Sequence, residues 1–522
     1  MDLSTSGPNE KQSAVQDSRP AQTRLEARSS GGSWSPVAAL PLWPVLLSAL
    51  LTGGVAFWGI TGPEMWYDEA ASVSAADRPL GSLLRLLRDV DAVHALYYLV
   101  MQPWVSVFGI SELSMRTPSS IAVIIAAAAA THLSMIYARR WMPDRIVAVG
   151  LSTSVVIAVL PGFTWTAQEA RGYAMGAMAA TAALWCFELW RETRSSRWLV
   201  AFALMQAAAI GFTLYAITVL LVYTLRCLPL RRSDLLKGLA AIVAVALAVV
   251  PLLLLGASQS AQVSWIQLDM SAVLPRMTRN VFFLSSVNRG GPWSEVSRTI
   301  APWLGVLIVV LILIGMARGP GRKPMAWLAA YVLTPMVVVL VAQMLGGQYF
   351  QERYFAFTAP ALMVLLGLAL GAVRWRPVMA AAVTAIVVLA APSLLAQNVH
   401  DAKQGDNYET AAQLIATTDT VIFMEDSTRG ALISYPQDKE IADPMLAEHR
   451  VPAANLWGTN HPDHRAWTID PTGSVSVVSY KRNENHEVVL RHLYEIGCTF
   501  RDQDRDTGLL ISRVDCPAPA AG

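Results

Sequence analysis

The sequence predicts a polytopic α-helical membrane protein of about eleven transmembrane helices, followed by a small C-terminal extracytoplasmic α/β domain. Three observations predict this fold class. Of the 522 residues, 54% are hydrophobic and only 15% are charged, whereas a soluble domain carries about 25% charged residues. Long apolar stretches recur between residues 37 and 396. Beyond residue 398 these stretches stop, and short strand-like and helix-like segments alternate instead.

The N-terminal segment, residues 1–35, is rich in Ser, Gln, Glu, Arg and Gly and has no hydrophobic periodicity. We therefore predict that it is a disordered cytoplasmic leader. It is too long and too polar for the charged end of a signal peptide, and no small-residue cleavage site follows the first apolar stretch. We expect that stretch to be retained as a transmembrane helix.

A membrane-spanning helix needs about 20 apolar residues. The stretch 197–226 begins and ends beside basic residues, so it must cross the membrane twice or not at all. Its length suits two short helices, which we expect to be separated by a break near Gly211. The other predicted spans are 37–60, 116–138, 146–164, 172–190, 236–257, 300–317, 325–346, 354–373 and 377–396.

Basic residues beside short loops mark the cytoplasmic side of a membrane protein. Because residue 139 must be inside, only one of the stretches 92–109 and 116–138 can cross. The first is the shorter and contains His94, so we expect it to lie in the outer interface, together with the amphipathic stretch 80–90. The clusters that fix this orientation are Arg19/Arg24/Arg28, Arg139/Arg140/Arg145, Arg191/Arg194/Arg197, Arg226/Arg231/Arg232/Lys237, Arg318/Arg322/Lys323 and Arg374/Arg376.

This orientation places every polar segment of interest outside the cell membrane. We divide the chain into a transmembrane module, 36–397, and an extracytoplasmic α/β domain, 398–522. In the domain, "NYETAAQLIA" and "EVVLRHLYEIG" predict helices, whereas "TVIFM", "VSVVSY" and "TGLLISRV" predict strands. The outer segments of the module are 61–115, 164–174, 258–299 and 346–355.

The four cysteines fall into two pairs. Cys498 and Cys516 lie in the polar tail, where an oxidising compartment would make a disulfide between them plausible. Cys186 and Cys227 fall in or beside apolar helices. No cysteine or histidine spacing predicts a metal site. We expect no cofactor, although Asp and Glu side chains could recruit a divalent cation.

Two adjacent carboxylates, Asp68 and Glu69, follow a Trp-Tyr pair directly after the first span. They are either the polar start of an outer loop behind an aromatic interface belt, or a general base and its neighbour. The sequence does not decide between these two interpretations of Asp68 and Glu69.

Two further outer segments place an arginine beside a helix end, against the usual preference for basic residues inside. "QEARGY" contains Gln168, Glu169 and Arg171, and "QERY" contains Glu352 and Arg353. The guanidinium fork suits a phosphate, while the alternative is a snorkelling arginine paired with Glu169. His94 is either a structural residue or a phosphate or hydroxyl contact.

Several classes of binding site are not indicated. The sequence has no P-loop, dinucleotide fingerprint, zinc motif or serine nucleophile elbow, and a formal net charge of +2 implies no nucleic-acid partner. A phosphate that is handled outside the membrane is therefore expected to arrive on a lipid.

Four stretches together resemble a known family. They are "WYDEAAS" after the first span, "VHALYYLVMQPWVSVFGISELSMRTPSSIAV" before the next, "QEARGYAM" and "ERYFAFTAPAL". Over about residues 38–396 the chain resembles the C-type (GT-C) membrane glycosyltransferases, especially the branch of the protein O-mannosyltransferases and the lipid A aminoarabinose transferase. The family often reads His-Pro-Pro-Leu where this chain has "HALY" at 94–97, and this departure weighs against protein mannosylation.

The resemblance implies an inverting transferase of cell-envelope biosynthesis that uses a polyprenyl-phosphate sugar, with Asp68 as the catalytic base and Glu69 beside it. The polar tail is similar to that of actinobacterial members, which implies mannose as the sugar, arabinose as runner-up, and a glycan or glycolipid as acceptor. Membrane lipids are the other expected partners. The remaining site residues are Arg171, Arg353 and His94 for the donor phosphate, and Gln168, Glu169, Glu352 and Tyr67 for substrate binding.

Two other classes of function compete with this one. A transporter or flippase of a lipid-linked glycan would carry ionisable residues near the membrane midplane. Here the spans are nearly free of charge and the charged residues collect on one side, which favours an enzyme. A sensor is the third possibility, but nothing resembles a cytoplasmic output domain.

Overall fold

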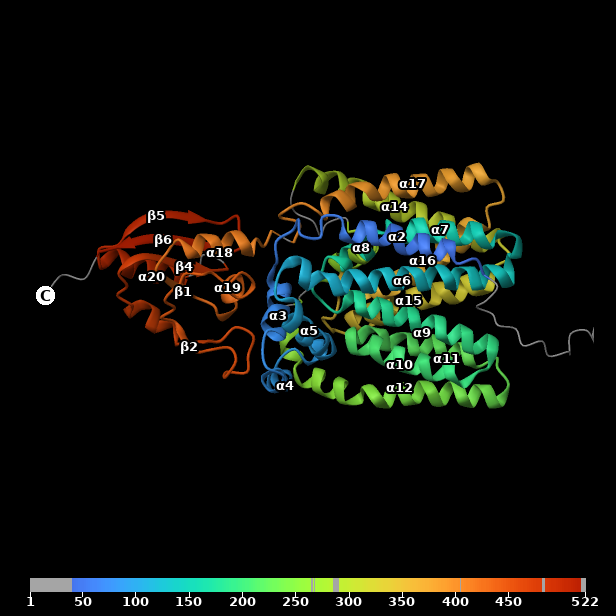
Figure 1. The fold of residues 1–522 in the computed structure, drawn as a ribbon, viewed down its shortest axis with the longest axis horizontal. Coiled ribbons are helices and arrows are strands. Elements are labelled where there is room, and N and C mark those ends of the chain that lie inside the picture. Colours follow the sequence, from blue (N-terminus) through green and yellow to red (C-terminus); the bar gives the residue numbers. More distant parts are fainter. Residues whose placement is uncertain are drawn as a thin grey trace, which may run out of the picture. The chain divides into compact units, whose positions relative to one another are not determined.

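The computed structural model describes residues 40–263, 266, 268–284, 291–403, 405–480 and 484–517 (Figure 1). The predicted leader, 1–35, lies outside the described residues. Helices dominate the part before residue 398, where they run side by side in a bundle (Figure 1). The predicted fold class, a polytopic helical membrane protein with a small C-terminal strand-containing domain, is confirmed.

A helix or helix pair occupies each predicted span. The helices before residue 398 are α2 (Trp43–Phe57), α3 (Tyr67–Ala76), α4 (Leu80–Asp89), α5 (Ala95–Phe108), α6 (Glu112–Trp141), α7 (Ile146–Ala158), α8 (Pro161–Ala167), α9 (Tyr173–Thr193), α10 (Ser196–Phe212), α11 (Leu220–Cys227), α12 (Arg232–Ser258), α13 (Met270–Arg279), α14 (Gly291–Arg318), α15 (Arg322–Met344), α16 (Ala359–Gly371) and α17 (Arg376–Ala396).

In the described part of the chain, six helices are long and apolar enough to cross a membrane. They are α6, α12, α14, α15, the helix Glu352–Gly371 that ends with α16, and α17. The pair α7 and α8 is bent by 63° and would be a seventh span. The apolar helices α2, α10 and α11 are shorter, so the total of about eleven crossings stays a prediction.

Two details of the predicted topology reappear in the structure. The stretch 197–226 breaks after α10 ends at Phe212, one residue beyond Gly211, and a 3₁₀ helix (Leu214–Val219) leads into α11. α5 has only 14 residues and lies with α3 and α4 at one end of the bundle, whereas α6 continues along it for 30 residues (Figure 1). The break fits two short helices in 197–226, and the length and place of α5 agree with a non-crossing segment before α6.

One boundary differs from the prediction. The outer segment 258–299 is not a simple loop, because it contains α13 and the first turns of α14, which begins at Gly291. Hydropathy detects the apolar middle of a helix but not its polar end. Pro292 stands in the first turn of α14, where proline is favourable because no helical N–H is lost.

The tail contains a four-stranded sheet in the order β1-β4-β6-β5. β1 (Thr420–Phe423) is parallel to β4 (Gly473–Ser479), and β6 (Leu510–Cys516) is antiparallel to both β4 and β5 (Thr499–Asp504). A short ribbon, β2 (Leu446–Glu448) with β3 (Thr459–Asn460), stands apart. The helices are α18 (Tyr408–Ala416), α19 (Gly430–Ser434) and α20 (Glu484–Glu495).

Alternate residues of each strand face opposite helices, as the two-residue period of a strand requires. Ile422 of β1 and Val477 of β4 pack with α20, whereas Val421 and Val478 pack with α18. The three predicted strands and two predicted helices are present. β5 was not predicted, because its sequence "TFRDQD" is polar and shows no apolar alternation.

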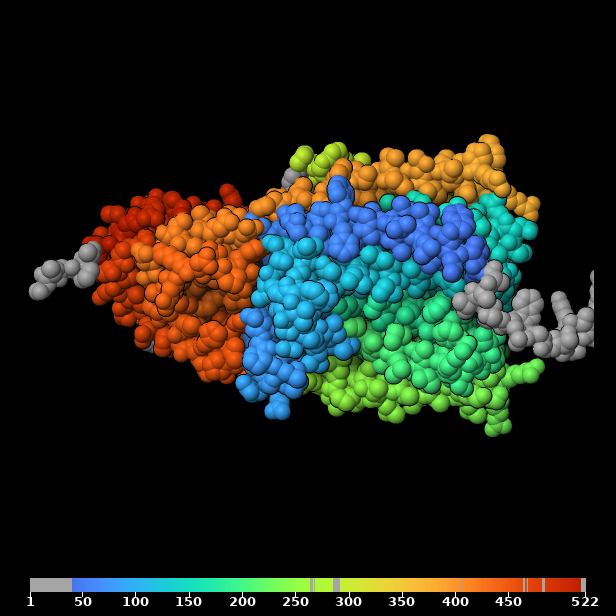
Figure 2. All heavy atoms as spheres, in the orientation of Figure 1, coloured from blue at the N-terminus to red at the C-terminus, as the bar shows by residue number. Residues whose placement is uncertain are grey.

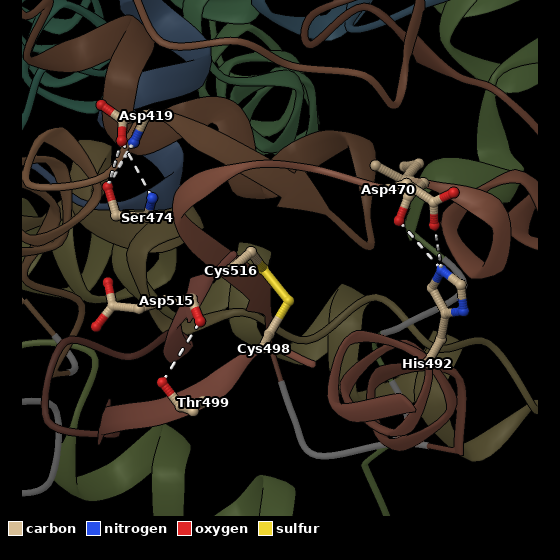
Figure 3. Close-up of a disulfide and its surroundings, with 9 residues drawn as sticks. Asp419, Asp470, Ser474, His492, Cys498, Thr499, Asp515 and Cys516 are labelled. Carbon is tan, nitrogen blue, oxygen red and sulfur yellow. Dashed lines mark hydrogen bonds and ion pairs between the residues drawn. A yellow bond between two sulfur atoms is a disulfide. The ribbon is translucent and has the colours of Figure 1, made fainter. Parts of the chain in front are cut away.

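A disulfide joins Cys498, just before β5, to Cys516 at the end of β6 (Figure 3). This is the pair singled out from the sequence. Non-reducing mass spectrometry of protein from intact membranes should therefore give one cross-linked peptide pair, because an outer domain matures in an oxidising compartment. Cys186 and Cys227 are buried and free, so their peptides serve as internal controls. Two free thiols at positions 498 and 516 would count against an outer location.

The orientation of the bundle can be tested directly with single cysteines. Ala447 in β2 and Ser233 in α12 are both exposed. We expect Ala447→Cys to react with an impermeant maleimide in intact cells, and Ser233→Cys to react only after permeabilisation, because the basic clusters place α12 inside at its start. The reverse pattern would overturn the predicted orientation.

The tail contacts the bundle at the segment that holds α3 to α5. In Figure 2 the tail (orange and red) lies directly against this segment (blue), and α19 packs on α3. The end of the bundle that carries the predicted site is thus the end that meets the tail.

Candidate active site

The two adjacent carboxylates lie in the first turn of α3, which begins at Tyr67 after the extended residue Trp66. Acidic side chains in a first helical turn are favoured by the helix dipole. Successive helical residues diverge by about 100°. Asp68 and Glu69 consequently face different partners, and the site has two halves.

In the first half, Asp68 lies between two arginines. Its Oδ1 is 3.2 Å from Nη2 of Arg171, and its Oδ2 is 3.0 Å from Nη2 of Arg353. The three side chains are only 10%, 6% and 12% exposed, respectively. Burial alone would raise the pKa of Asp68, but Arg353 and Arg171 hold it below its ordinary value, so the carboxylate is ionised. One carboxylate facing two guanidinium groups leaves one positive charge in excess.

Aromatic neighbours hold both arginines in place. Arg171 Nη1 donates to the Tyr98 hydroxyl at 2.8 Å, and this hydroxyl donates to Asp91 Oδ2 at 2.7 Å. The Arg353 guanidinium lies 5.2 Å from the centre of the Trp66 ring, a cation–π arrangement. The two cations are therefore preorganised around Asp68.

His94 joins this half of the site. Its ring lies 6.0 Å from the Tyr98 ring, and its buried Nδ1 has no hydrogen-bond partner among the described residues. Burial and the nearby Arg171 lower its pKa to about 4, so the imidazole is neutral near pH 7. A neutral ring with a free nitrogen suits a hydroxyl contact better than a charge contact.

In the second half, Glu69 is fully buried and both of its oxygens are engaged. Arg116 donates from Nε to Oε1 at 2.8 Å and from Nη2 to Oε2 at 2.7 Å, and the backbone N–H of Ala170 donates to Oε1 at 3.0 Å. Arg116 also donates to the carbonyls of Ile60, Pro63 and Glu64. This geometry favours a positioning role for Glu69 beside Asp68.

Glu169 belongs to the second half and pairs with Lys403, from the start of the tail. Trp66 Nε1 donates to the other oxygen of Glu169 at 3.2 Å. The Lys403 ammonium donates to the carbonyl of Gln168 at 2.6 Å and lies 4.9 Å from the centre of the Trp165 ring. Burial raises the pKa of Glu169, and Lys403 opposes that rise. The predicted alternative, a pairing of Arg171 with Glu169, is not what the structure shows, because Arg171 pairs with Asp68.

The other predicted substrate-binding residues lie outside this cluster. Gln168 donates its amide to Trp58 O at 3.1 Å and to Asn398 Oδ1 at 2.7 Å, which favours a structural role. Glu352 faces α13, where it accepts a hydrogen bond from Asn280 at 3.2 Å and lies 3.7 Å from Arg276. A cavity of about 40 Å³ lies there, lined by Glu352, Arg353 and Trp165 among others. Tyr67 is exposed beside the tail.

Two residues of the cluster were missed from the sequence. Arg116 carried a usable signal, because it is a third arginine at the outer end of a span, within the stretch "SMRTPSS". Lys403 carried none, since a lysine in a polar tail is ordinarily solvated; here it is only 2% exposed.

Within the described ranges, no group of three or more His, Cys, Asp or Glu side chains could hold a metal ion.

Comparison with known proteins bears on the fold. No protein-family model and no curated protein matches this sequence. The structure of ArnT from Cupriavidus metallidurans bound to undecaprenyl phosphate matches with a TM-score of 0.54 and 15% identity, over 90% of this chain and 98% of that one. The chain has the ArnT fold. The apo structure of ArnT gives a TM-score of 0.53 at 16% identity, over 90% and 97% of the two chains.

The ArnT match supports the C-type (GT-C) membrane glycosyltransferase fold that the sequence predicted. Arabinofuranosyltransferase AftD from Mycobacteria is also similar, at 13% identity over 92% of this chain and 40% of that one. The TM-score of this match is 0.45.

Proposed function

We propose that this chain is a membrane glycosyltransferase that moves a sugar from a polyprenyl-phosphate donor to a hydroxyl of an extracytoplasmic glycan or glycolipid. The observation that carries the proposal is the buried Asp68 between Arg171 and Arg353, in a chain with the ArnT fold. ArnT in one of the matching structures is bound to undecaprenyl phosphate, which supports a lipid phosphate as the donor here.

The reaction is a single displacement at the anomeric carbon. An oxygen of the acceptor forms the new bond to this carbon while the bond from the carbon to the phosphate oxygen breaks. The electron pair stays on the phosphate, and the acceptor proton moves to the Asp68 carboxylate. The products are a glycoside of inverted configuration and a polyprenyl phosphate.

The two arginines stabilise the leaving phosphate. Its negative charge grows as the bond breaks, and preorganised cations at that position lower the barrier. In the free protein the same arginines hold the pKa of Asp68 low, which makes it a weak base. Once a donor phosphate shares the two guanidinium groups, the pKa of Asp68 rises and the carboxylate becomes a better base. Donor binding would thus increase the basicity of Asp68.

For the sugar we propose mannose, which rests on the resemblance of the chain to actinobacterial mannosyltransferases. An arabinosyl or other pentosyl group is the second candidate. A lipid-linked glycan flippase is the competing class, but α3, which carries Asp68, lies at the end of the bundle that meets the tail (Figure 1), and this fits transfer at one membrane face better than movement between faces.

The decisive experiment uses purified full-length protein in lipid nanodiscs with radiolabelled polyprenyl-phosphate mannose or polyprenyl-phosphate arabinose and extracted membrane lipids. Label in a new product, with release of polyprenyl phosphate, supports the transferase. Movement of the intact donor across a liposome membrane without any transfer would support the flippase instead.

The arginines give a quantitative prediction. A charge-assisted contact to phosphate is worth about 1.5–3 kcal/mol, or about a ten- to hundredfold change. Arg171→Ala and Arg353→Ala should therefore each weaken binding of labelled polyprenyl phosphate by about that factor. Arg276→Ala is the matched control, because Arg276 is 46% exposed and pairs with Glu352 instead. Equal affinities in all three variants would remove the phosphate role.

A further inference from the structure

The helix that carries Asp68 also holds a loop of the tail. Arg450 Nη1 donates to the carbonyl of Ser74 in α3 at 2.7 Å, and its Nη2 lies 2.8 Å from Asp77 Oδ2. Arg78, two residues after the end of α3, donates to the carbonyl of Asn455 at 3.0 Å. The hydroxyl of Ser74 donates to the carbonyl of Leu456. These bonds fasten the loop 450–458 to α3, so the tail is a fixed part of this end of the bundle.

The same loop presents Trp457 in a set position. The side chain of Asn455 accepts hydrogen bonds from the backbone N–H groups of Trp457 at 3.2 Å and of Gly458 at 2.7 Å. Behind the indole, a Cβ on Gly430 would come within 3.2 Å of the ring, so Gly430 leaves the space that the ring needs. The orientation of the ring is set by this packing.

Tyr67 contacts two rings of the tail, those of Trp457 and Tyr480, at the edge of the proposed active site. The centre of the Tyr67 ring is 5.4 Å from that of Trp457 and 6.3 Å from that of Tyr480. Tyr67 is 37% exposed, and the other two rings are half-buried. We call these three residues the aromatic platform. Polar groups border it: the Tyr480 hydroxyl lies 3.3 Å from that of Tyr408, and the Tyr480 backbone N–H donates to Glu425 Oε2 at 3.3 Å.

We propose that the aromatic platform binds a sugar ring of the acceptor, an inference that rests on the proposed glycosyl transfer. A sugar ring offers a face of C–H groups that packs on aromatic rings, and a rim of hydroxyls that hydrogen-bonds to neighbouring polar groups. A site of this kind combines aromatic surface with a few polar groups. Two of the three rings, those of Trp457 and Tyr480, come from the tail, so the tail selects the acceptor.

The aromatic platform lies directly beside the proposed base. Tyr67 is the residue directly before Asp68, and consecutive Cα atoms are about 3.8 Å apart. A sugar packed on Tyr67 and Trp457 would hold its hydroxyls beside the proposed base, while the lipid phosphate is held by Arg171 and Arg353. The donor phosphate would thus contact the arginines beside Asp68, and the acceptor sugar would contact the tyrosine beside it.

The test uses full-length protein in nanodiscs with methyl α-mannopyranoside and methyl α-arabinofuranoside as probes, observed by saturation-transfer NMR. We expect signals from the ring C–H groups of at least one glycoside. Trp457→Ala should abolish them, and should raise the acceptor KM in the transfer assay about tenfold. Trp457→Phe should keep most of both, because an aromatic face remains. Trp375→Ala, at a tryptophan that is 68% exposed between α16 and α17, is the matched control.

Binding of labelled polyprenyl phosphate separates this proposal from the proposed function. If Trp457→Ala loses the glycoside signals but binds the lipid phosphate normally, the platform is an acceptor site. Unchanged glycoside signals in both Trp457→Ala and Tyr480→Ala would overturn it while leaving the transferase intact. Loss of lipid-phosphate binding as well, or an altered affinity of the protein for empty vesicles, would also overturn it, since the rings would then serve domain packing or membrane anchoring.

Discussion

Asp68→Asn should reduce turnover by about 10²–10⁴-fold, because general-base catalysis contributes a factor of that size. The substitution keeps the size of the side chain and removes its basicity. Arg171 and Arg353 lose a negative partner, so binding of labelled polyprenyl phosphate should be unchanged or tighter. Single-turnover transfer in nanodiscs, with donor affinity measured separately, resolves the two effects.

Asp89→Asn is the control for this experiment. It makes the same chemical change in the last residue of α4, another helix at this end of the bundle, at an exposed side chain. Transfer by this variant should stay near the wild-type rate. Should Asp68→Asn also transfer sugar at that rate, the two carboxylates are only the polar start of an outer segment.

The sequence supported those parts of the fold that depend on local hydrophobicity. Apolar stretches located a helix at every predicted span, and β-branched residues located β1, β4 and β6. β5 escaped because an edge strand with the sequence "TFRDQD" has no apolar alternation to detect. The start of α14 escaped because its first turns are polar. In both cases the residues are too polar for hydropathy to detect the element.

The candidate site was predictable in its parts but not in its connections. Asp68, Arg171 and Arg353 were each identified by an unusual charge at an outer helix end, yet they are separated by 103 and 182 positions in the chain. Only packing brings them within 3.2 Å. The pairing of Glu169 with Lys403 was unpredictable for a further reason, because it depends on where the tail returns to the bundle.

Glu69→Gln should cause a large loss of stability. It removes the charge that compensates Arg116, which is fully buried. Breaking a buried ion pair by changing one partner costs about 3–5 kcal/mol, since the remaining charge is left without compensation. Glu192→Gln is the control: it breaks a pair with Arg139 whose side chains are 20% and 27% exposed, and it should cost about 1 kcal/mol or less.

Unfolding in mixed micelles measures both losses, and a double variant identifies their source. Glu69→Gln with Arg116→Gln removes both charges and should recover part of the stability. Recovery should stay incomplete, because Arg116 also donates to the carbonyls of Ile60, Pro63 and Glu64, which then lose a buried donor. Equal stability of Glu69→Gln and Glu192→Gln would show that the buried pair does not hold α3. If it does hold α3, the Glu69→Gln protein that remains folded should transfer sugar more slowly while binding polyprenyl phosphate normally, because Asp68 directly precedes Glu69 on the same helix.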